Sequence, residues 1–298
     1  MWNIDETGCF WKTLPDKGFA QKTKQCKGGK KCKQRVTVAF VVNAAGESET
    51  QPIVIGSSEN PRCFKGINKS KLPVKYFSQP KAWMTGEIVD KVFSEVNKQL
   101  KSKGRSVLLL MDNAGCHPED LNGKYSNIKV AFFPPNTTSV LQPLDLGIIK
   151  NFKVQYRKLL MRFILAKIDQ CSSASEVVKS ITILLDTRWI AEAWRNVSSD
   201  TIRKCFRKAG ILNCDFSLVQ PLLSVEDDPF EELDDNSDSD LVGELADLIR
   251  GVQGDAELCS PLELISAESD LPVCLKFLIK NGKMNLWITL AQIARSQA

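Results

Sequence analysis

The order of the expected secondary-structure elements predicts an α/β fold, in which helices pack on a sheet. Three strand-like segments come first, a helix and two further strands follow, and helices take up the next part of the chain. The segment SVLLLMD at residues 106–112 supports this class, because it is apolar almost throughout and short. Such a run is typical of a strand that is buried on both faces.

The first half of the chain holds most of the expected strands. The first of them should end near Asp5, within the sequence NIDETG. Residues 35–43 are rich in β-branched and apolar side chains, and residues 50–55 repeat this type after a turn that contains glycine, so together they predict a hairpin or a meander. Residues 87–100 carry apolar side chains at the spacing of one helix face, which predicts an amphipathic helix.

After the buried strand at residues 106–112, the chain changes from strands to helices. Residues 129–133 favour one more short strand, which Pro134 and Pro135 end. A long amphipathic helix is expected at residues 145–168. Shorter helices are expected at residues 173–185, 189–194 and 198–209.

The charges are divided unevenly along the chain. Residues 1–223 hold 35 basic and 19 acidic residues, a net charge of +16, whereas residues 224–298 hold 5 and 16, a net charge of −11. A strongly basic body indicates a polyanionic partner, for which nucleic acid is the first expectation. Residues 226–240 are acidic, contain serine and offer little to bury, so we expect disorder there. The apolar segment at residues 271–298 leads to no interpretation.

Several classes of protein are excluded by composition. The longest apolar runs are far too short to span a bilayer, and the acidic start lacks the apolar core of a signal peptide, so we expect neither a membrane partner nor secretion. The ten cysteines form no Cys-x-x-Cys pair and there is a single histidine, which excludes the usual zinc sites. We therefore expect reduced thiols in an intracellular protein.

Two aspartates follow or end predicted strands. Asp5 stands at the end of the first predicted strand, and Asp112 ends the buried strand at residues 106–112. An ionised carboxylate at the end of an apolar strand is costly unless water, hydrogen bonds or a cation compensates it. Ligands of open α/β sheets also tend to bind at the carboxyl ends of strands. The alternative is that each aspartate only starts a turn, which is common for this residue.

Asp145 opens the predicted long helix on the side that should pack against the sheet. On a helical wheel it aligns with Ile149, Phe152 and Tyr156. Capping of the helix N-terminus would explain this aspartate without any function. It would not explain why three carboxylates converge on one edge of one sheet, whereas a site for hard divalent cations such as Mg²⁺ or Mn²⁺ would.

Three sequence blocks resemble the signature blocks of the pogo/Tigger-type DDE transposases. They are NIDETGCFWK at residues 3–12, MDNAGCHP at residues 111–118 and PPNTTSVLQPLDLG at residues 134–147. Tigger-derived, jerky-like and centromere-protein-B-like proteins share these blocks, and the resemblance covers about residues 1–215. It implies a ribonuclease-H-like mixed sheet flanked by helices, with a helical C-terminal extension. The remaining residues, 216–298, then form a separate acidic tail.

The same resemblance implies the chemistry of the site. In the family, Asp5, Asp112 and Asp145 would hold two Mg²⁺ or Mn²⁺ ions, which activate a water or a DNA 3′-hydroxyl and stabilise the leaving oxygen. Asn113 and His117 match the block after the second aspartate. They are candidates for orienting the ligands or a phosphate, and structural hydrogen bonding is the alternative for both. Glu6 is expected to have a structural role instead of a ligand role.

Two groups of cations are candidates for contact with DNA phosphates. A loop at residues 21–35 holds seven cations and no acid, which suits either phosphates or nuclear import, and the alternative is a merely solvated hairpin. The helix at residues 145–168 carries a second stripe, open to the same alternatives. The members of the two groups are Lys22, Lys24, Lys27, Lys30, Lys31, Lys33 and Arg35 in the loop, and Lys150, Lys153 and Arg157 in the helix.

Two function classes remain open after the sequence is read. The first is a DDE endonuclease or transposase that cleaves DNA, and the second is a domesticated, non-enzymatic nuclear DNA-binding protein that keeps the fold. Members of the family carry helix-turn-helix domains ahead of this region, so the sequence is expected to be a fragment or a derivative that has lost site recognition. We expect DNA as the partner and the nucleus as the location, and a homodimer stays open.

Overall fold

A mixed sheet organises the part of the chain that the structure describes. In the computed structural model β1 lies near the middle of the sheet, and the six strands follow the order β4-β3-β2-β1-β5-β6. The strands are β1 (Trp2–Cys9), β2 (Val36–Asn43), β3 (Ile53–Gly56), β4 (Lys75–Ser78), β5 (Val107–Met111) and β6 (Ile128–Phe132). The described residues are 1–13, 34–115, 117, 121–168, 170–171, 174–211 and 242–248.

The pairing of the strands confirms the ribonuclease-H-like sheet. Strands β1, β2 and β3 form an antiparallel meander, whereas β5 and β6 run parallel to β1 on its other side. A parallel neighbour needs a crossover connection, and the helix α1 (Gly86–Ser102) supplies it between β4 and β5. The expected meander at residues 35–55 and the buried strand at residues 106–112 are therefore both present.

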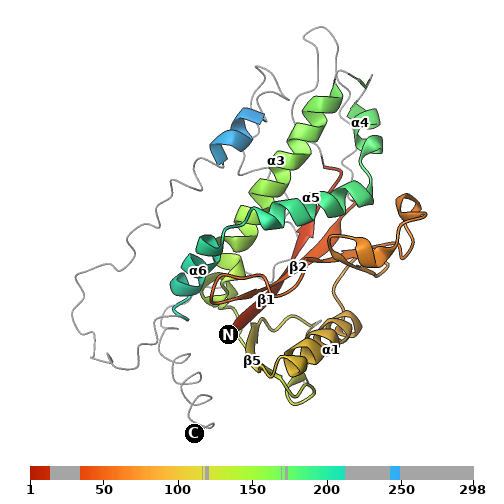
Figure 1. The fold of residues 1–298 in the computed structure, drawn as a ribbon. Helices are drawn as coiled ribbons and strands as arrows, with labels where there is room; N and C mark the ends of the chain where they lie inside the picture. The colour runs from red at the N-terminus through yellow and green to blue at the C-terminus, as the bar shows by residue number, and fades with distance from the viewer. Residues whose placement is uncertain are drawn as a thin grey trace, which may run out of the picture.

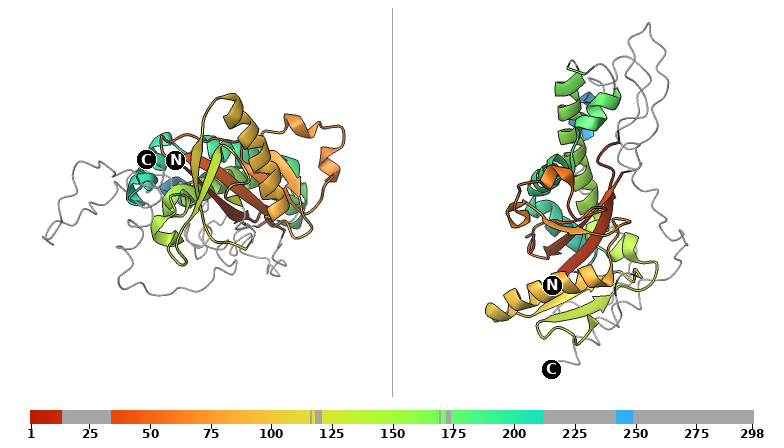
Figure 2. Two further views of the ribbon diagram at one scale, coloured as in Figure 1. Left: turned by 90° about the horizontal axis from the view of Figure 1, so that it is seen from below. Right: turned by 90° about the vertical axis from the view of Figure 1, so that its right-hand side faces the viewer.

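Helices cover both faces of the sheet (Figures 1 and 2). On one face α1 packs through the apolar stripe that its sequence predicts, including Val89 and Phe93. The other face carries a larger apolar cluster, in which Phe40 of β2 contacts Phe152 and Trp194. The helices on that side are α3 (Ile149–Ile168), α4 (Ala174–Ser180), α5 (Ile183–Arg195) and α6 (Ser199–Lys208).

Three features of the secondary structure differ from those predicted. Strand β1 continues four residues past Asp5, because its partner β2 pairs with it over its whole length. Strand β4 was not predicted, since its side chains are all half-buried and show no alternation. In place of the helices expected at residues 173–185 and 189–194, the structure has α4 and α5. The break between them comes at Thr182, whose side chain caps α5 by accepting a hydrogen bond from the backbone N–H of Leu185.

The start of the long helix also departs from a regular helix. A π turn, η4 (Leu144–Ile148), precedes α3, and Gly147 within it has a φ of 154°. A short helix α2 (Thr138–Leu141) comes just before this turn. A Cβ atom at Gly147 would lie 3.3 Å from the Sγ atom of Cys205 on α6. The conformation and the close approach of α6 both favour glycine at this position.

We expect the substitution Gly147→Ala to destabilise the protein by about 1–3 kcal/mol, because alanine strains a backbone at this φ and crowds Cys205. Urea unfolding measures the change. Gly243→Ala is the matched control, because it lies in a helix with open space around its Cβ position and should be neutral or slightly stabilising. Equal stability of the parent and Gly147→Ala would show that η4 tolerates a side chain.

One segment of the predicted acidic tail is described. Residues 242–248 form a helix beside α3 (Figure 1), with Leu245 fully buried in the cluster that contains Phe152. The carboxylate of Glu244 forms an ion pair with Lys158 of α3. The other predicted features of this region, at residues 226–240 and 271–298, lie outside the described residues.

The helices of the described part include none that combines the length and the apolar character needed to cross a bilayer.

Candidate active site

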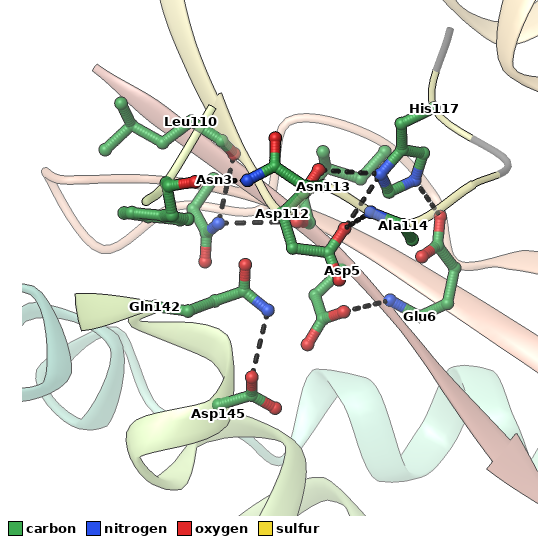
Figure 3. Close-up of polar contacts among 12 residues, drawn as sticks. Asn3, Asp5, Glu6, Leu110, Asp112, Asn113, Ala114, His117, Gln142 and Asp145 are labelled. Carbon is green, nitrogen blue, oxygen red and sulfur yellow. Dashed lines mark hydrogen bonds and ion pairs between the residues drawn. The ribbon is translucent and has the colours of Figure 1, made fainter. Parts of the chain in front are cut away.

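The three predicted carboxylates converge where β5 ends beside the central strand β1 (Figure 3). Strand β1 runs parallel to β5, and Asn3 is the partner of Leu110. Asp5 and Asp112 each lie two residues further along, so they are neighbours across the two strands. Asp145 comes from the π turn η4, which contacts β1. One central strand, the end of its parallel neighbour and a turn therefore supply one aspartate each.

Asn3 fixes these three elements to one another. Its side-chain Nδ2 donates to the carbonyl of Leu110 at 3.1 Å, and its Oδ1 accepts from the backbone N–H of Leu144 at 3.0 Å. The side chain is completely buried, so these hydrogen bonds are shielded from water. Asn3 was not among the predicted site residues, although a lone asparagine in a buried strand is a signal that could have identified it.

Asp5 and Asp145 share one negative environment. Burial, together with the negative charges of Asp145, Glu6 and Asp112, raises the pKa of Asp5 well above its usual range, against a backbone hydrogen bond from Glu6 at 2.7 Å. Asp145 keeps access to solvent. Desolvation by the surrounding atoms still raises its pKa, although side-chain hydrogen bonds with Asp5 and Gln142 oppose the rise. Crowded carboxylates of this kind attract either a proton or a cation.

Gln142 holds Asp145 in place. Its Nε2 donates to Oδ2 of Asp145 at 3.0 Å, and the residue is almost completely buried. Among the described residues, no group donates a hydrogen bond to its buried Oε1. A buried acceptor without a donor is costly, which is the condition expected where an oxygen faces a ligand. The sequence analysis included Gln142 in a signature block but gave it no role.

Asp112 is held by the single histidine. The Nδ1 of His117 lies 2.8 Å from Oδ1 of Asp112, and its Nε2 lies 3.1 Å from Oε1 of Glu6. The ring donates to both carboxylates at once only when both nitrogens carry a proton. Burial would raise the pKa of Asp112, but the hydrogen bond and charge of His117 and the backbone N–H of Ala114 hold it below its usual range. Asp112 is therefore the carboxylate of the three that is most readily ionised.

The two predicted neighbours of Asp112 differ in what they contact. His117 touches Asp112 directly and links it to Glu6, which gives Glu6 the structural role expected for it. Asn113 instead donates to the carbonyl of Phe133, beyond the end of β6. That contact joins the ends of β5 and β6, which favours the structural alternative for Asn113.

The cations predicted as an exposed stripe do not share one environment. Lys150 is exposed, but Lys153 and Arg157 are buried, so the prediction that they belong to an exposed basic stripe was wrong for these two residues. The prediction assumed that one side of the helix faces solvent, whereas residues 151–154 and 156–158 of α3 are all buried. Lys153 lies near Asp145, and its charge opposes the rise in the pKa of that carboxyl that burial causes. Arg157 donates to the carbonyl of Phe10 at 3.5 Å.

Most of the predicted basic loop lies outside the described residues. This applies to Lys22, Lys24, Lys27, Lys30, Lys31 and Lys33. Arg35 is described, and its guanidinium lies over the ring of Trp83, 5.0 Å from the ring centroid.

The donor set of the site suits a hard divalent cation in its chemistry. It offers three carboxylates and the buried Oε1 of Gln142, which are oxygen donors of the kind that Mg²⁺ and Mn²⁺ prefer. In the described part of the chain, no three carboxylate, imidazole or thiol groups are already placed to ligate one ion. The residues therefore fit the metal in kind, and their side chains would need to draw together around it.

The burial of Asp5 predicts how the stability of the folded protein depends on pH. Because the pKa of Asp5 is raised above its ordinary value of 3.8, the folded protein binds more protons than the unfolded chain in the window above that value. We therefore expect the metal-free protein to lose stability as the pH rises through this window. Asp5→Asn should remove that loss and raise the melting temperature near neutral pH.

Melting curves recorded in chelator from pH 4 to pH 8 measure this effect. Asp200→Asn changes an exposed carboxylate that pairs with Arg203 in the first turn of α6, so as the control its curve should lie only slightly below that of the parent and show the same loss toward neutral pH. A lower melting temperature of Asp5→Asn at neutral pH would contradict the prediction.

A model of the DDE superfamily endonuclease family matches residues 33–206 of the chain. The matched region contains Asp112 and Asp145 but begins after Asp5, which β1 brings beside them in the fold.

The chain is also similar to individual proteins. It is 34% identical over 210 residues to the Tigger transposable element-derived protein 4 of Mus musculus. This match covers 70% of this chain and 39% of that protein. It is 30% identical over 231 residues to the CENP-B homolog protein 2 of Schizosaccharomyces pombe, with 74% and 43% covered. The chain thus spans less than half the length of these relatives. Among solved structures, the chain is similar to the Mos1 transposase paired-end complex with left transposon end, at 14% identity and a TM-score of 0.31. The match covers 70% of this chain and 55% of the transposase chain.

Proposed function

The chain belongs to the DDE superfamily endonucleases, and we propose that it cleaves DNA phosphodiester bonds and transfers strands with the help of divalent metal ions. The observation that carries this proposal is the meeting of Asp5, Asp112 and Asp145 where β5 ends beside β1. Each comes from a different element, and Asn3 ties those elements together. A purely structural role for each aspartate would not require them to share a site.

The three aspartates would hold two Mg²⁺ or Mn²⁺ ions, which supply Lewis-acid stabilisation of the charge that develops on the phosphate. The residues of the chain contribute position and charge. Gln142 orients Asp145, and His117 orients Asp112 while keeping it ionised. In the hydrolytic step, a water oxygen forms a bond to phosphorus, the bond from phosphorus to the 3′-oxygen breaks, and one proton passes from the water to that oxygen. In strand transfer, a DNA 3′-hydroxyl takes the place of the water.

DNA is the proposed partner, and the nucleus is the proposed location. The net charge of +16 over residues 1–223 supports both, because a polyanion is attracted to such a surface. Lys150 is exposed on α3 and is available for a phosphate, whereas the buried Lys153 and Arg157 are assigned to the interior. A homodimer would be compatible with this proposal and is not required by it.

A second function, DNA binding without cleavage, is favoured by one observation. The described carboxylates are not already arranged around a common ion, and a host protein that has kept only the fold would tolerate this. The two functions predict different results with the same substrate, since both bind DNA but only one breaks it.

The test is the nicking of supercoiled plasmid DNA by the purified full chain. We expect nicked and linear products with Mg²⁺ or Mn²⁺ and none with a chelator present. Differential scanning fluorimetry with the metal alone gives a readout without DNA, and binding should raise the melting temperature by an amount that grows with metal concentration. If the chain binds DNA tightly but gives no cleavage products and no metal-induced rise in melting temperature, the second function is favoured.

A further inference from the structure

The loop between β4 and α1 holds a tryptophan out into solvent. Trp83 is 49% exposed, whereas its neighbours Ala82 and Met84 are buried. Ala82 has a φ of 52°, a left-handed conformation that is uncommon for a residue with a Cβ atom. Such a conformation persists only where the surrounding contacts enforce it, and it is often found at functional sites.

Side-chain hydrogen bonds enforce the shape of this loop. The Oε1 atom of Gln79 accepts from the backbone N–H of Lys81 at 2.6 Å and from that of Trp83 at 3.3 Å. The hydroxyl of Thr37 donates to the carbonyl of Ala82 at 2.6 Å, which fastens the loop to β2. Trp83 is therefore displayed by a fixed loop and does not owe its exposure to a loose one.

A cation lies against the displayed ring. The guanidinium of Arg35 is 5.0 Å from the centroid of the Trp83 ring, a cation–π distance. About half of the tryptophan nevertheless stays open to solvent. An exposed aromatic surface with a fixed cation beside it has the chemistry that recognises single-stranded nucleic acid, because bases stack on the ring and phosphates are attracted to the charge.

The loop that carries Trp83 is fastened to β2, the strand beside β1, which carries Asp5. Thr37, which fastens the loop, pairs with Gly8 of β1. Gly8 is three residues beyond Asp5, which is about 10 Å at roughly 3.3 Å per strand residue. Thr37 is three positions from Phe40, the partner of Asp5, so side-chain alternation places the loop on the α1 face of the sheet and Asp5 on the α3 face.

We propose that Trp83 stacks on an unpaired nucleobase of the DNA that this chain binds, and that Arg35 holds the adjoining phosphate. This inference rests on the proposed function and adds a recognition element to it. In a continuous duplex each base is already stacked between its neighbours. A free base face arises where the strand is interrupted or where a base leaves the helix, so Trp83 selects interrupted DNA over continuous duplex.

The experiment measures binding of the full chain to dye-labelled oligonucleotides by fluorescence anisotropy, in chelator so that no cleavage occurs. The probes are a single strand, a duplex with a short gap and a continuous blunt duplex of equal length. We expect Trp83→Ala to weaken binding of the first two by about 5- to 100-fold, the range that one stacked base provides, and to change blunt-duplex binding less than about twofold. Trp83→Phe should retain most of the affinity for gapped DNA.

Two controls separate stacking from other effects. Val140→Ala alters another exposed apolar residue, on α2, and should leave all three affinities unchanged. Replacing single bases near the gap by abasic sites should abolish the difference between the parent and Trp83→Ala at one position only. If Trp83→Ala binds gapped DNA as tightly as the parent does, the inference is wrong while the proposed function stands. If the parent binds no DNA of any form, the proposed function fails and this inference fails with it.

Discussion

Replacing any one of Asp5, Asp112 and Asp145 by asparagine is expected to lower metal-dependent DNA cleavage by at least about a thousandfold. Asparagine keeps the shape of the side chain and removes the charge that would hold a cation. A thousandfold loss corresponds to about 4 kcal/mol of transition-state stabilisation, which is within the several kcal/mol that a catalytic metal supplies. Gel analysis of supercoiled plasmid over time measures the rate.

The three losses should not add, because the residues act as one unit. A double variant of Asp112 and Asp145 should be no slower than the slower of the two single variants. The control is Asp200→Asn, an exposed carboxylate on α6, which should cleave at the parental rate. If Asp145→Asn cleaved DNA within about tenfold of the parent, the aspartate of η4 would have only a capping role.

Phe40→Ala should produce the largest loss of stability, about 3–5 kcal/mol. Phe40 is 1% exposed, its ring stacks on Trp194 at a centroid distance of 4.0 Å, and it meets Phe152 edge-on at 4.7 Å. The alanine variant leaves a cavity that two rigid aromatic neighbours fill poorly. Because Phe40 is the cross-strand partner of Asp5, the cavity would open directly beside the site.

Urea unfolding followed by circular dichroism measures the effect of Phe40→Ala. Phe40→Leu should lose less, since it keeps most of the apolar volume. Val140→Ala removes an exposed apolar side chain and should change stability by less than about 0.5 kcal/mol. A loss below about 1 kcal/mol for Phe40→Ala would mean that the aromatic cluster repacks easily, and that it does not fix the position of β1.

The features that could be predicted from the sequence are those with a strong local pattern. The stripe of α1 and the apolar run of β5 each follow from a few neighbouring residues, and both are confirmed. Strand β4 has no such pattern, because it lies at the edge of the sheet and its four side chains are half-buried. Its existence depends on pairing with β3, which no local pattern reports.

The candidate site divides in the same way. Its three aspartates stand in recognisable blocks, but their supporting residues act over long distances in the sequence: Asn3 contacts Leu110, and Glu6 contacts His117. The burial of Lys153 depends on packing around nearly the whole of this part of α3, which a helical wheel with one apolar face does not represent. Such contacts are decided by tertiary structure and leave little trace in the local sequence.

The helix at residues 242–248 has a consequence for the order of folding. The described part of this helix is too short to persist in water by itself, so it forms on an α3 surface that is already folded. The ion pair of Lys158 and Glu244 joins positions 86 residues apart, whereas Tyr156 and Asp186 are 30 apart. Closing the longer loop costs more chain entropy before any contact compensates it. We therefore expect Leu245 to pack on α3 after α3 and α5 have joined, and to leave α3 before these two helices separate.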